Sequence, residues 1–283
     1  MKRILFGIVT LAGFSFSAAA QQQPVVNEHD EYNYQKLGVK ERVAVPYPSI
    51  READVIFEKR VYRVIDTREK KNLVMQWPKN PLNKIIYDLT TIDDGGFTRL
   101  KAYRNDSLSS AYTADDVRKM GAIEETVFVG TDPNDPSLGY DSLVSTPFDY
   151  TTIKRFLIYE QWIFDKQRGM LFPRIIAIAP VYNPMINGVE LPEQPMFWIS
   201  WNEIRPLLVN EEVFNRQNDA MRLTYYDFFE LRLFSSYITR ESNEFDYAIK
   251  DFPEYKDSPM DALYESERIK GDIFTWEHDL WQY

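Results

Sequence analysis

The sequence has no cysteine and only two histidines, His29 and His278. The missing cysteine excludes disulfide bonds, thiol nucleophiles and Cys-based metal sites. Two histidines cannot form a three-His zinc site, and a Ser-His-Asp triad would have to recruit a histidine near one end of the chain. We therefore expect the fold to draw its stability from an apolar core or from assembly with other chains.

Long apolar runs are missing everywhere except at the N-terminus. Residues 1–20 hold the bases Lys2 and Arg3, then the run ILFGIVTLAGFSFS, then small residues before Gln21. This order is typical of a cleavable secretory signal peptide. The run is short and rich in Ser and Gly for a membrane helix, so an uncleaved anchor is the weaker alternative. We expect no direct membrane insertion of the remaining chain and no lipid anchor, since no Cys follows the run.

Positive charge is in the minority, with 33 Lys and Arg against 43 Asp and Glu, a net charge of −10. Loss of residues 1–20 would remove two bases, Lys2 and Arg3, and bring the net charge from −10 to −12. Nucleic acids and anionic membranes are bound through basic surfaces, so the composition argues against both as partners. With 44% hydrophobic and 15% aromatic residues, the chain is not compositionally disordered.

One stretch, FEKRVYRVIDTREKKN at residues 57–72, reverses this balance with six bases and three acids. Its apolar residues recur at helical spacing, which predicts a helix over residues 53–69. Two interpretations of its charges stay open: a solvated helix face, or a docking surface for an acidic partner. The candidate docking residues in this stretch are Lys59, Arg60 and Arg63.

The C-terminal tail carries a second candidate docking surface. Ile273, Trp276, Leu280 and Trp281 follow one face of a predicted helix. This face can pack on the core of its own chain or dock on a neighbouring subunit, because amphipathic terminal helices bind readily in grooves. Trp276 and Trp281 are the candidates for contact with a partner.

The remaining pattern predicts an α+β fold: a small, mostly antiparallel sheet with flanking helices, an extended N-terminal arm and a helical C-terminal third. Strands are expected at residues 97–103, 156–164, 170–182 and 196–201, and a loop at 129–142. Helices are expected to begin at Asn80, Thr113, Thr224 and Ser258, with Gly271 ending the last of them. The predicted organisation is a signal peptide at 1–20, an arm at 21–48 and a single domain at 49–283.

No motif indicates chemistry. The segment 132–141, DPNDPSLGYD, resembles a calcium loop only faintly, because a proline occupies a ligand position and the closing Glu is missing. Close carboxylate pairs are unavoidable among 43 acids, so spacing alone cannot identify a glycosidase pair. We therefore predict a protein that is not an enzyme, with no catalytic residue, no metal and no cofactor.

Four segments in order resemble the gliding-motility GldN / PorN family of Bacteroidota. They are residues 53–72, 159–182, 234–243 and 263–281, among them FSSYITRESN and LYESERIKGDIFTWEHDLW. The resemblance covers nearly all of the chain after its predicted signal peptide. None of the four is a chemical motif, so no residue-level site comes with the family.

The resemblance implies a non-enzymatic structural subunit of a periplasmic ring, needed for type IX protein secretion and gliding motility. Its implied partners are a GldK / PorK-type lipoprotein, the periplasmic part of a GldM / PorM-type motor protein, and neighbouring copies in the ring. The implied location is the periplasm, next to the outer membrane through the lipoprotein. Two alternatives remain: a periplasmic carbohydrate- or peptide-binding module, suggested by the many aromatic residues, and a secreted hydrolase.

Overall fold

The computed structural model describes residues 42–280, apart from 93–97, 133–134, 147, 187–188 and 219. All of the described residues lie in one compact unit, Val39–Tyr283. The predicted signal peptide and most of the predicted arm therefore lie outside the described residues.

The described unit combines helices with antiparallel strands, which confirms the α+β prediction. The helices are α1 (Leu82–Thr91), α2 (Ala114–Lys119), α3 (Trp201–Leu208), α4 (Tyr225–Glu230) and α5 (Pro259–Leu280), with short 3-10 helices η2 (Glu52–Asp54), η3 (Asn72–Gln76), η4 (Tyr150–Thr152) and η5 (Ile249–Asp251). The longer strands are β1 (Val55–Asp66), β2 (Ile123–Asp132), β3 (Asp135–Thr146), β4 (Arg155–Asp165), β5 (Met170–Tyr182) and β12 (Tyr237–Glu241). Two-residue strands complete the set: β6 (Met185–Ile186), β7 (Val189–Glu190), β8 (Gln194–Pro195), β9 (Ile199–Ser200), β10 (Glu212–Val213) and β11 (Leu223–Thr224).

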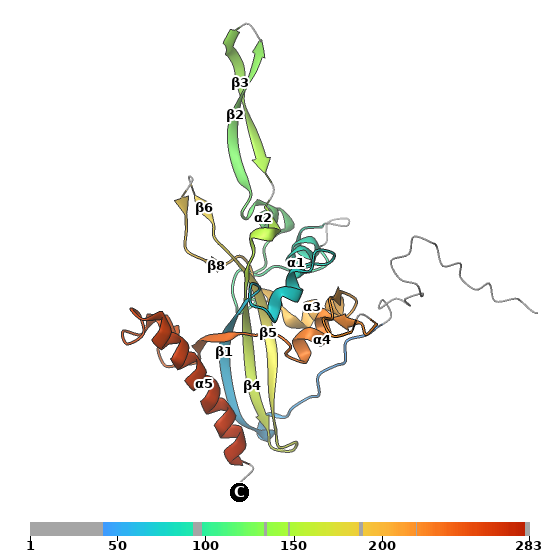
Figure 1. Cartoon of the computed structure of the whole chain (residues 1–283), viewed down its shortest axis with the longest axis vertical. Coiled ribbons are helices and arrows are strands. Elements are labelled where there is room, and N and C mark those ends of the chain that lie inside the picture. The colour runs from blue at the N-terminus through green and yellow to red at the C-terminus, as the bar shows by residue number, and fades with distance from the viewer. Residues whose placement is uncertain are drawn as a thin grey trace, which may run out of the picture. The chain divides into compact units, whose positions relative to one another are not determined.

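The main sheet has the order β12-β1-β4-β5-β8, and β9 also pairs with β5. Strands β1, β4 and β5 run side by side along most of their length (Figure 1). The strands predicted at residues 156–164 and 170–182 are confirmed as β4 and β5. Residues far apart in the sequence meet at the other side of β1, where Tyr62 pairs with Arg240 of β12.

The helix predicted over residues 53–69 is wrong, because this segment is strand β1. Its β-branched and aromatic residues favour a strand. The alternation was hidden because the second half of β1 is covered on both faces, so Val61, Tyr62, Arg63 and Ile65 are all buried. A polar residue at a buried position, Arg63, therefore interrupted the pattern that would have identified the strand.

Both faces of the sheet bury apolar side chains. On one face, Ile65, Phe156 and Ile178 pack with the apolar sides of α1, α3 and α4 in the largest core cluster. Farther along the same face of β1, Val61 packs with Ile269 and Ile273 of α5. On the opposite face, a separate and smaller cluster consists of Tyr62, Ala177, Ala179 and Trp198. No described helix packs over this second cluster. A pocket lies on this face of the sheet, and Tyr62 and Trp198 contribute to its wall.

Three further expectations from the sequence are corrected. Residues 129–142 were predicted to be a loop, but β2 and β3 pair there as a hairpin, and Pro136 lies within β3. In the segment 97–103 the described residues form isolated bridges, Tyr103 with Ala111 and with Trp198, rather than a regular strand. Gly271 does not end the last helix, which continues to Leu280, because Gly271 does not adopt the positive φ of a glycine that ends a helix.

The capping signals identified helix starts reliably. Capping boxes begin α2, from Thr113 to Asp116, and α4, from Thr224 to Asp227. Asn80 is an exception: helix α1 begins after Pro81, and the Asn80 amide donates instead to Glu211 and to the carbonyl of Glu212. Of the strand predicted at 196–201, only Ile199–Ser200 form a strand, β9, and Trp201 begins α3.

The described end of the predicted arm, residues 42–48, lies against α3 and α4. The Tyr47 hydroxyl donates to Glu230 over 2.5 Å, and burial with this hydrogen bond raises the pKa of Tyr47 to about 12. Arg205 lies over the Tyr47 ring and donates to the carbonyl of Val45, while Arg42 pairs with Asp227 at 2.8 Å. This part of the arm is thus held by the domain itself.

Candidate functional site: a basic pocket at strand β12

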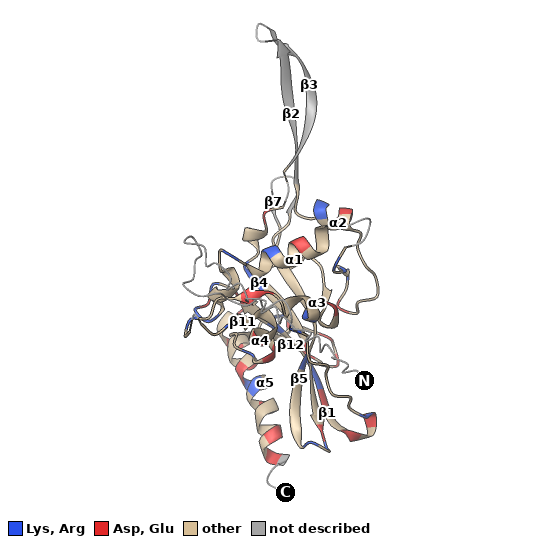
Figure 2. Cartoon of the chain, turned by 90° about the vertical axis from the view of Figure 1, so that its right-hand side faces the viewer, with Lys and Arg blue, Asp and Glu red and all other residues tan. Residues whose placement is uncertain are grey.

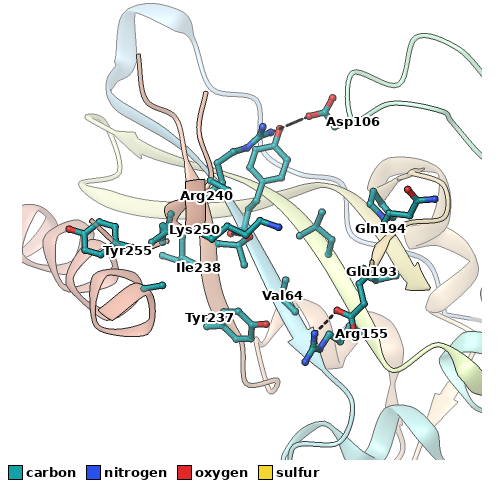
Figure 3. Close-up of a pocket in the computed structure, with 18 of the residues that line it drawn as sticks. Val64, Asp106, Arg155, Glu193, Gln194, Tyr237, Ile238, Arg240, Lys250 and Tyr255 are labelled. Atoms are coloured by element: carbon teal, nitrogen blue, oxygen red, sulfur yellow. Dashed lines mark hydrogen bonds and ion pairs between the residues drawn. The ribbon is translucent and has the colours of Figure 1, made fainter. Parts of the chain in front are cut away.

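A pocket of about 1060 Å³ lies beside β12. Its wall is assembled from β1, β4 and β12, from the loop around Asp106, from the segment before β8 and from the residues that lead into α5 (Figure 3). Residues separated by more than a hundred positions in the sequence therefore share one cavity. Pockets of this size with an apolar wall and a few polar groups are the usual form of binding sites.

The wall of the pocket includes an apolar surface. Val64 of β1 and Leu157 of β4 come from the face of the sheet that also carries Tyr62. Val181 and Ile249 add to this surface. At the rim, the N-terminal turn of α5 exposes Met260 by 58% and Leu263 by 44%. The apolar surface thus continues from inside the pocket to its mouth.

One end of the pocket is a charged cluster around Tyr62. The Tyr62 hydroxyl donates to Asp106 over 2.5 Å, and burial raises the pKa of Tyr62. Arg240 lies 3.7 Å above the centre of the Tyr62 ring and pairs with Asp106 at 3.5 Å, while Tyr159 stacks on the same ring at 4.5 Å. Figure 3 shows Asp106 and Arg240 at the same end of the pocket. The cluster fixes the loop around Asp106 against the sheet.

Arg155 forms the other end. Its guanidinium lies 3.2 Å from the Asp66 carboxylate and also pairs with Glu193 (Figure 3). Arg68 completes the cluster at 2.5 Å from Asp66, and its hydrogen bond holds the pKa of Asp66 well below its ordinary value. Both acids at this end are therefore neutralised by arginines of the same chain.

Two lysines at the pocket lack an acidic partner. Lys250 reaches into the pocket from the β12 side (Figure 3), and Lys256 lies on the segment that leads into α5. Both are exposed, and neither forms an ion pair within the described part of the chain. After the internal pairs are formed, the pocket is left with positive charge.

The candidate docking residues of the basic stretch lie elsewhere. Lys59 pairs with Glu241 at 3.2 Å, and Arg60 is exposed and pairs with Glu58 at 3.1 Å. Arg63 is 6% exposed and donates to the Ser236 hydroxyl over 3.0 Å, and burial lowers its pKa. Of these three candidates, only Arg60 has a largely solvent-facing side chain; their proposed role in docking stays a prediction.

In the C-terminal tail, Trp276 packs within its own chain. Its ring stacks on Phe57 with centroids 4.1 Å apart and meets the edge of Phe164 at 5.5 Å. Trp281 lies outside the described residues. Acidic residues occur along the length of α5 (Figure 2), and the Phe274 side chain on the same helix is 68% exposed. Contact of the two tryptophans with a partner stays a prediction.

Sequence reasoning missed the pocket residues. Asp106, Arg155, Glu193 and Lys250 each lie in a different segment, and none has a local pattern that marks it. Only their pairing across the sheet brings them together. Arg240 is the partial exception, since it lies in the segment FSSYITRESN that carries the family resemblance.

Within the part of the chain that the structure describes, no group of three or more His, Asp and Glu is placed to hold a metal ion. Nor is any described helix both long and apolar enough to cross a membrane. The side chains of the faint calcium-loop segment at 132–141 lie outside the described part, so that expectation is not tested.

Comparison with known proteins gives one positive finding. No curated protein matches the sequence. The family model described as "Gliding motility associated protein GldN" matches residues 50–282, which includes every element of the main sheet and all of α5. The match extends over most of the chain and agrees with the resemblance carried by β1, β4, β5, β12 and α5. The chain belongs to the GldN family of gliding motility associated proteins.

Proposed function

We propose that this chain is a non-enzymatic structural subunit of a periplasmic ring that is needed for type IX protein secretion and gliding motility. The observation that carries the proposal is the family match over residues 50–282, and association with gliding motility follows from the family itself. In the proposed assembly a GldK / PorK-type lipoprotein holds the subunit under the outer membrane. The periplasmic part of a GldM / PorM-type motor protein is its second partner.

The distribution of exposed apolar side chains supports an assembly role. Helix α5 exposes Met260, Tyr264 and Phe274, and the segment that follows α4 exposes Leu231 and Leu233. Exposed large apolar side chains that gather on an element indicate contact surfaces. Two different surfaces are what a head-to-tail contact between copies requires, and such contacts close a ring when the rotation per subunit allows it.

A mass measurement tests the proposal. The purified chain is run by size-exclusion chromatography with light scattering, alone and after mixing with the lipoprotein partner. We expect a complex with several copies of both proteins in the mixture, because ring contacts need the partner. The monomer mass is 33.4 kDa for the whole chain and lower if the signal peptide has been cleaved. If the chain elutes at the monomer mass in both runs, the ring role is wrong.

A pull-down from envelope extract provides the second readout. We expect recovery of the lipoprotein together with the large inner-membrane motor protein. Recovery of the chain as a lone monomer from extracts that contain both proteins would contradict the proposed partners. The alternative of a peptide-binding module is supported by a different observation, the pocket beside β12.

A further inference from the structure

We propose that the pocket beside β12 docks an extended acidic peptide segment of a partner protein, with apolar side chains between its acidic ones. The inference does not depend on ring assembly, since it concerns a cavity within one chain. It assigns a binding role to Lys250, Lys256 and the apolar surface formed by Val64 and Leu157.

The pocket keeps positive charge that its own acidic residues do not neutralise. Its acids are neutralised within the chain: Asp106 accepts from Tyr62 and pairs with Arg240, and Glu193 pairs with Arg155. The cations Lys250 and Lys256 have no such partner among the described residues. In a chain with an excess of acids, a concave surface that keeps free lysines selects an anionic ligand.

The basic stretch of the sequence does not offer an equivalent surface. Lys59, Arg60 and Arg68 each pair with an acid of the same chain, and Arg63 is buried. Their charges are largely compensated at short range, so they add little attraction for a partner. Lys70 and Lys71 of the stretch are exposed but do not line the pocket. Among the described residues, Lys250 and Lys256 combine an unpaired charge with a position at the pocket.

The apolar wall of the pocket favours a ligand that also has apolar groups. Val64, Leu157 and Val181 line the same cavity as the lysines, and Met260 and Leu263 extend the apolar surface to an exposed rim. A free phosphate or sulfate would leave this wall uncovered. An enclosed apolar tunnel would suit a lipid chain, whereas this rim is open and carries charged side chains. A peptide with alternating acidic and apolar side chains satisfies both parts.

The edge of β12 decides how such a peptide would be held. The backbone N–H of Ile238 donates to the Ser266 hydroxyl of α5 over 2.8 Å, so helix α5 occupies this part of the strand edge. Addition of a further strand along β12 is therefore blocked at Ile238. The segment is held by its side chains, with carboxylates at the lysines and apolar groups on Val64 and Leu157.

The test uses the chain Gln21–Tyr283 and a labelled synthetic peptide of three Glu-Tyr repeats, followed by fluorescence anisotropy. The control peptide has three Gln-Tyr repeats and keeps the aromatic groups without the charge. We expect the acidic peptide to bind, the control to bind at least about tenfold more weakly, and added salt to weaken the acidic peptide's binding.

Variants of the protein locate the site. Lys250→Glu with Lys256→Glu should lower affinity for the acidic peptide at least about tenfold. The matched control, Lys70→Glu with Lys71→Glu, makes the same charge change at exposed positions outside the pocket and should change affinity less than about twofold. Circular dichroism melts confirm that both variants are folded.

Three outcomes would overturn the proposal: equal effects of the two double variants, equal binding of the two peptides, or displacement of the acidic peptide by decanoate at concentrations below those at which the peptide binds. The last would assign the pocket to a lipid. A failed ring assembly would leave all of these measurements unchanged, so the two proposals fail separately.

Discussion

The guanidinium of Arg232 lies 2.9 Å from the carboxylate of Glu160, whose side chain is completely buried at the centre of β4. Trp162 donates its indole N–H to the same carboxylate over 3.2 Å. Arg232 itself adopts a left-handed backbone conformation, with φ 52°, at the end of α4. The pair therefore ties the helical layer to the sheet through a charge that has no access to water.

Removal of Arg232 should destabilise the fold. Arg232→Met leaves the buried Glu160 carboxylate without its ion-pair partner, and such a loss costs about 3 kcal/mol of unfolding free energy. Urea denaturation followed by tryptophan fluorescence measures it. Arg268→Met, at an exposed arginine of α5, is the control and should cost less than about 1 kcal/mol. Adding Glu160→Met to Arg232→Met should recover stability; no recovery would mean that the pair is not the cause.

Arg60 and Arg63 should respond differently to charge reversal. Arg63→Glu places a second acid near the buried Glu160 and removes the bond to Ser236, so we expect a loss of about 3 kcal/mol or a failure to fold. Arg60→Glu changes an exposed side chain and should alter stability by less than about 1 kcal/mol. Thermal melts compare the two variants.

The same contrast decides how docking is tested. A combined Arg60→Glu and Arg63→Glu variant cannot separate lost docking from lost folding, since Arg63 is buried. Arg60→Glu alone gives a clean answer. If its affinity for the lipoprotein partner equals that of the unmodified chain, the basic stretch is not a docking surface at Arg60.

Trp276 should contribute to stability before it contributes to any interface. Trp276→Ala removes the stack on Phe57 and the edge contact with Phe164, and we expect a loss of about 2 kcal/mol. Phe274→Ala, two residues earlier and exposed, should leave stability nearly unchanged. Chemical denaturation checks both. If Trp276→Ala is as stable as the unmodified chain, the stack of Trp276 on Phe57 does not contribute to stability.

Because of Asp66, the free energy of unfolding should depend on pH. Its pKa is held well below the ordinary value, first by the hydrogen bond from Arg68, so the unfolded chain binds the proton more readily than the folded one. The resulting stabilisation is present above about pH 4 and is lost as the pH falls below that value. This loss is complete only after the pH has fallen through the lower pKa of the folded state. We expect Asp66→Asn to cost about 1 to 2 kcal/mol at pH 7 and progressively less as the pH falls below about 4, with a clearly smaller cost at pH 2. A cost that is the same at both pH values would contradict this origin.

Sequence patterns predicted the elements whose signals are local. The capping boxes at Thr113 and Thr224 gave two helix starts, because the cap and its partner lie three residues apart. The nearly continuous apolar run in β5 predicted a central strand, because that signal also lies within one short segment. Gly271 misled the prediction, since a glycine ends a helix where its backbone adopts a positive φ, and Gly271 stays helical.

The sequence could not reveal what depends on distant partners. Arg63 is a strand residue in the core only because Ser236 and the Glu160–Arg232 pair surround it, and those groups lie about a hundred residues or more away. The pocket depends on the same kind of pairing, since Asp106 and Arg240 meet only when β12 joins β1. The family resemblance found β12 as a segment and gave no indication of its cavity.

The position of β12 at the edge of the sheet also sets the order in which the fold can form. Strand β1 pairs with β4 through residues about a hundred positions apart, but its other neighbour, β12, is made of Tyr237–Glu241, much later in the sequence. A chain that emerges from its N-terminus first must leave one side of β1 unpaired until β12, more than about 170 positions later, has emerged. Pairings so distant in sequence also close slowly. During that interval β1 offers an open strand edge, and the late arrival of β12 and α5 is what removes it.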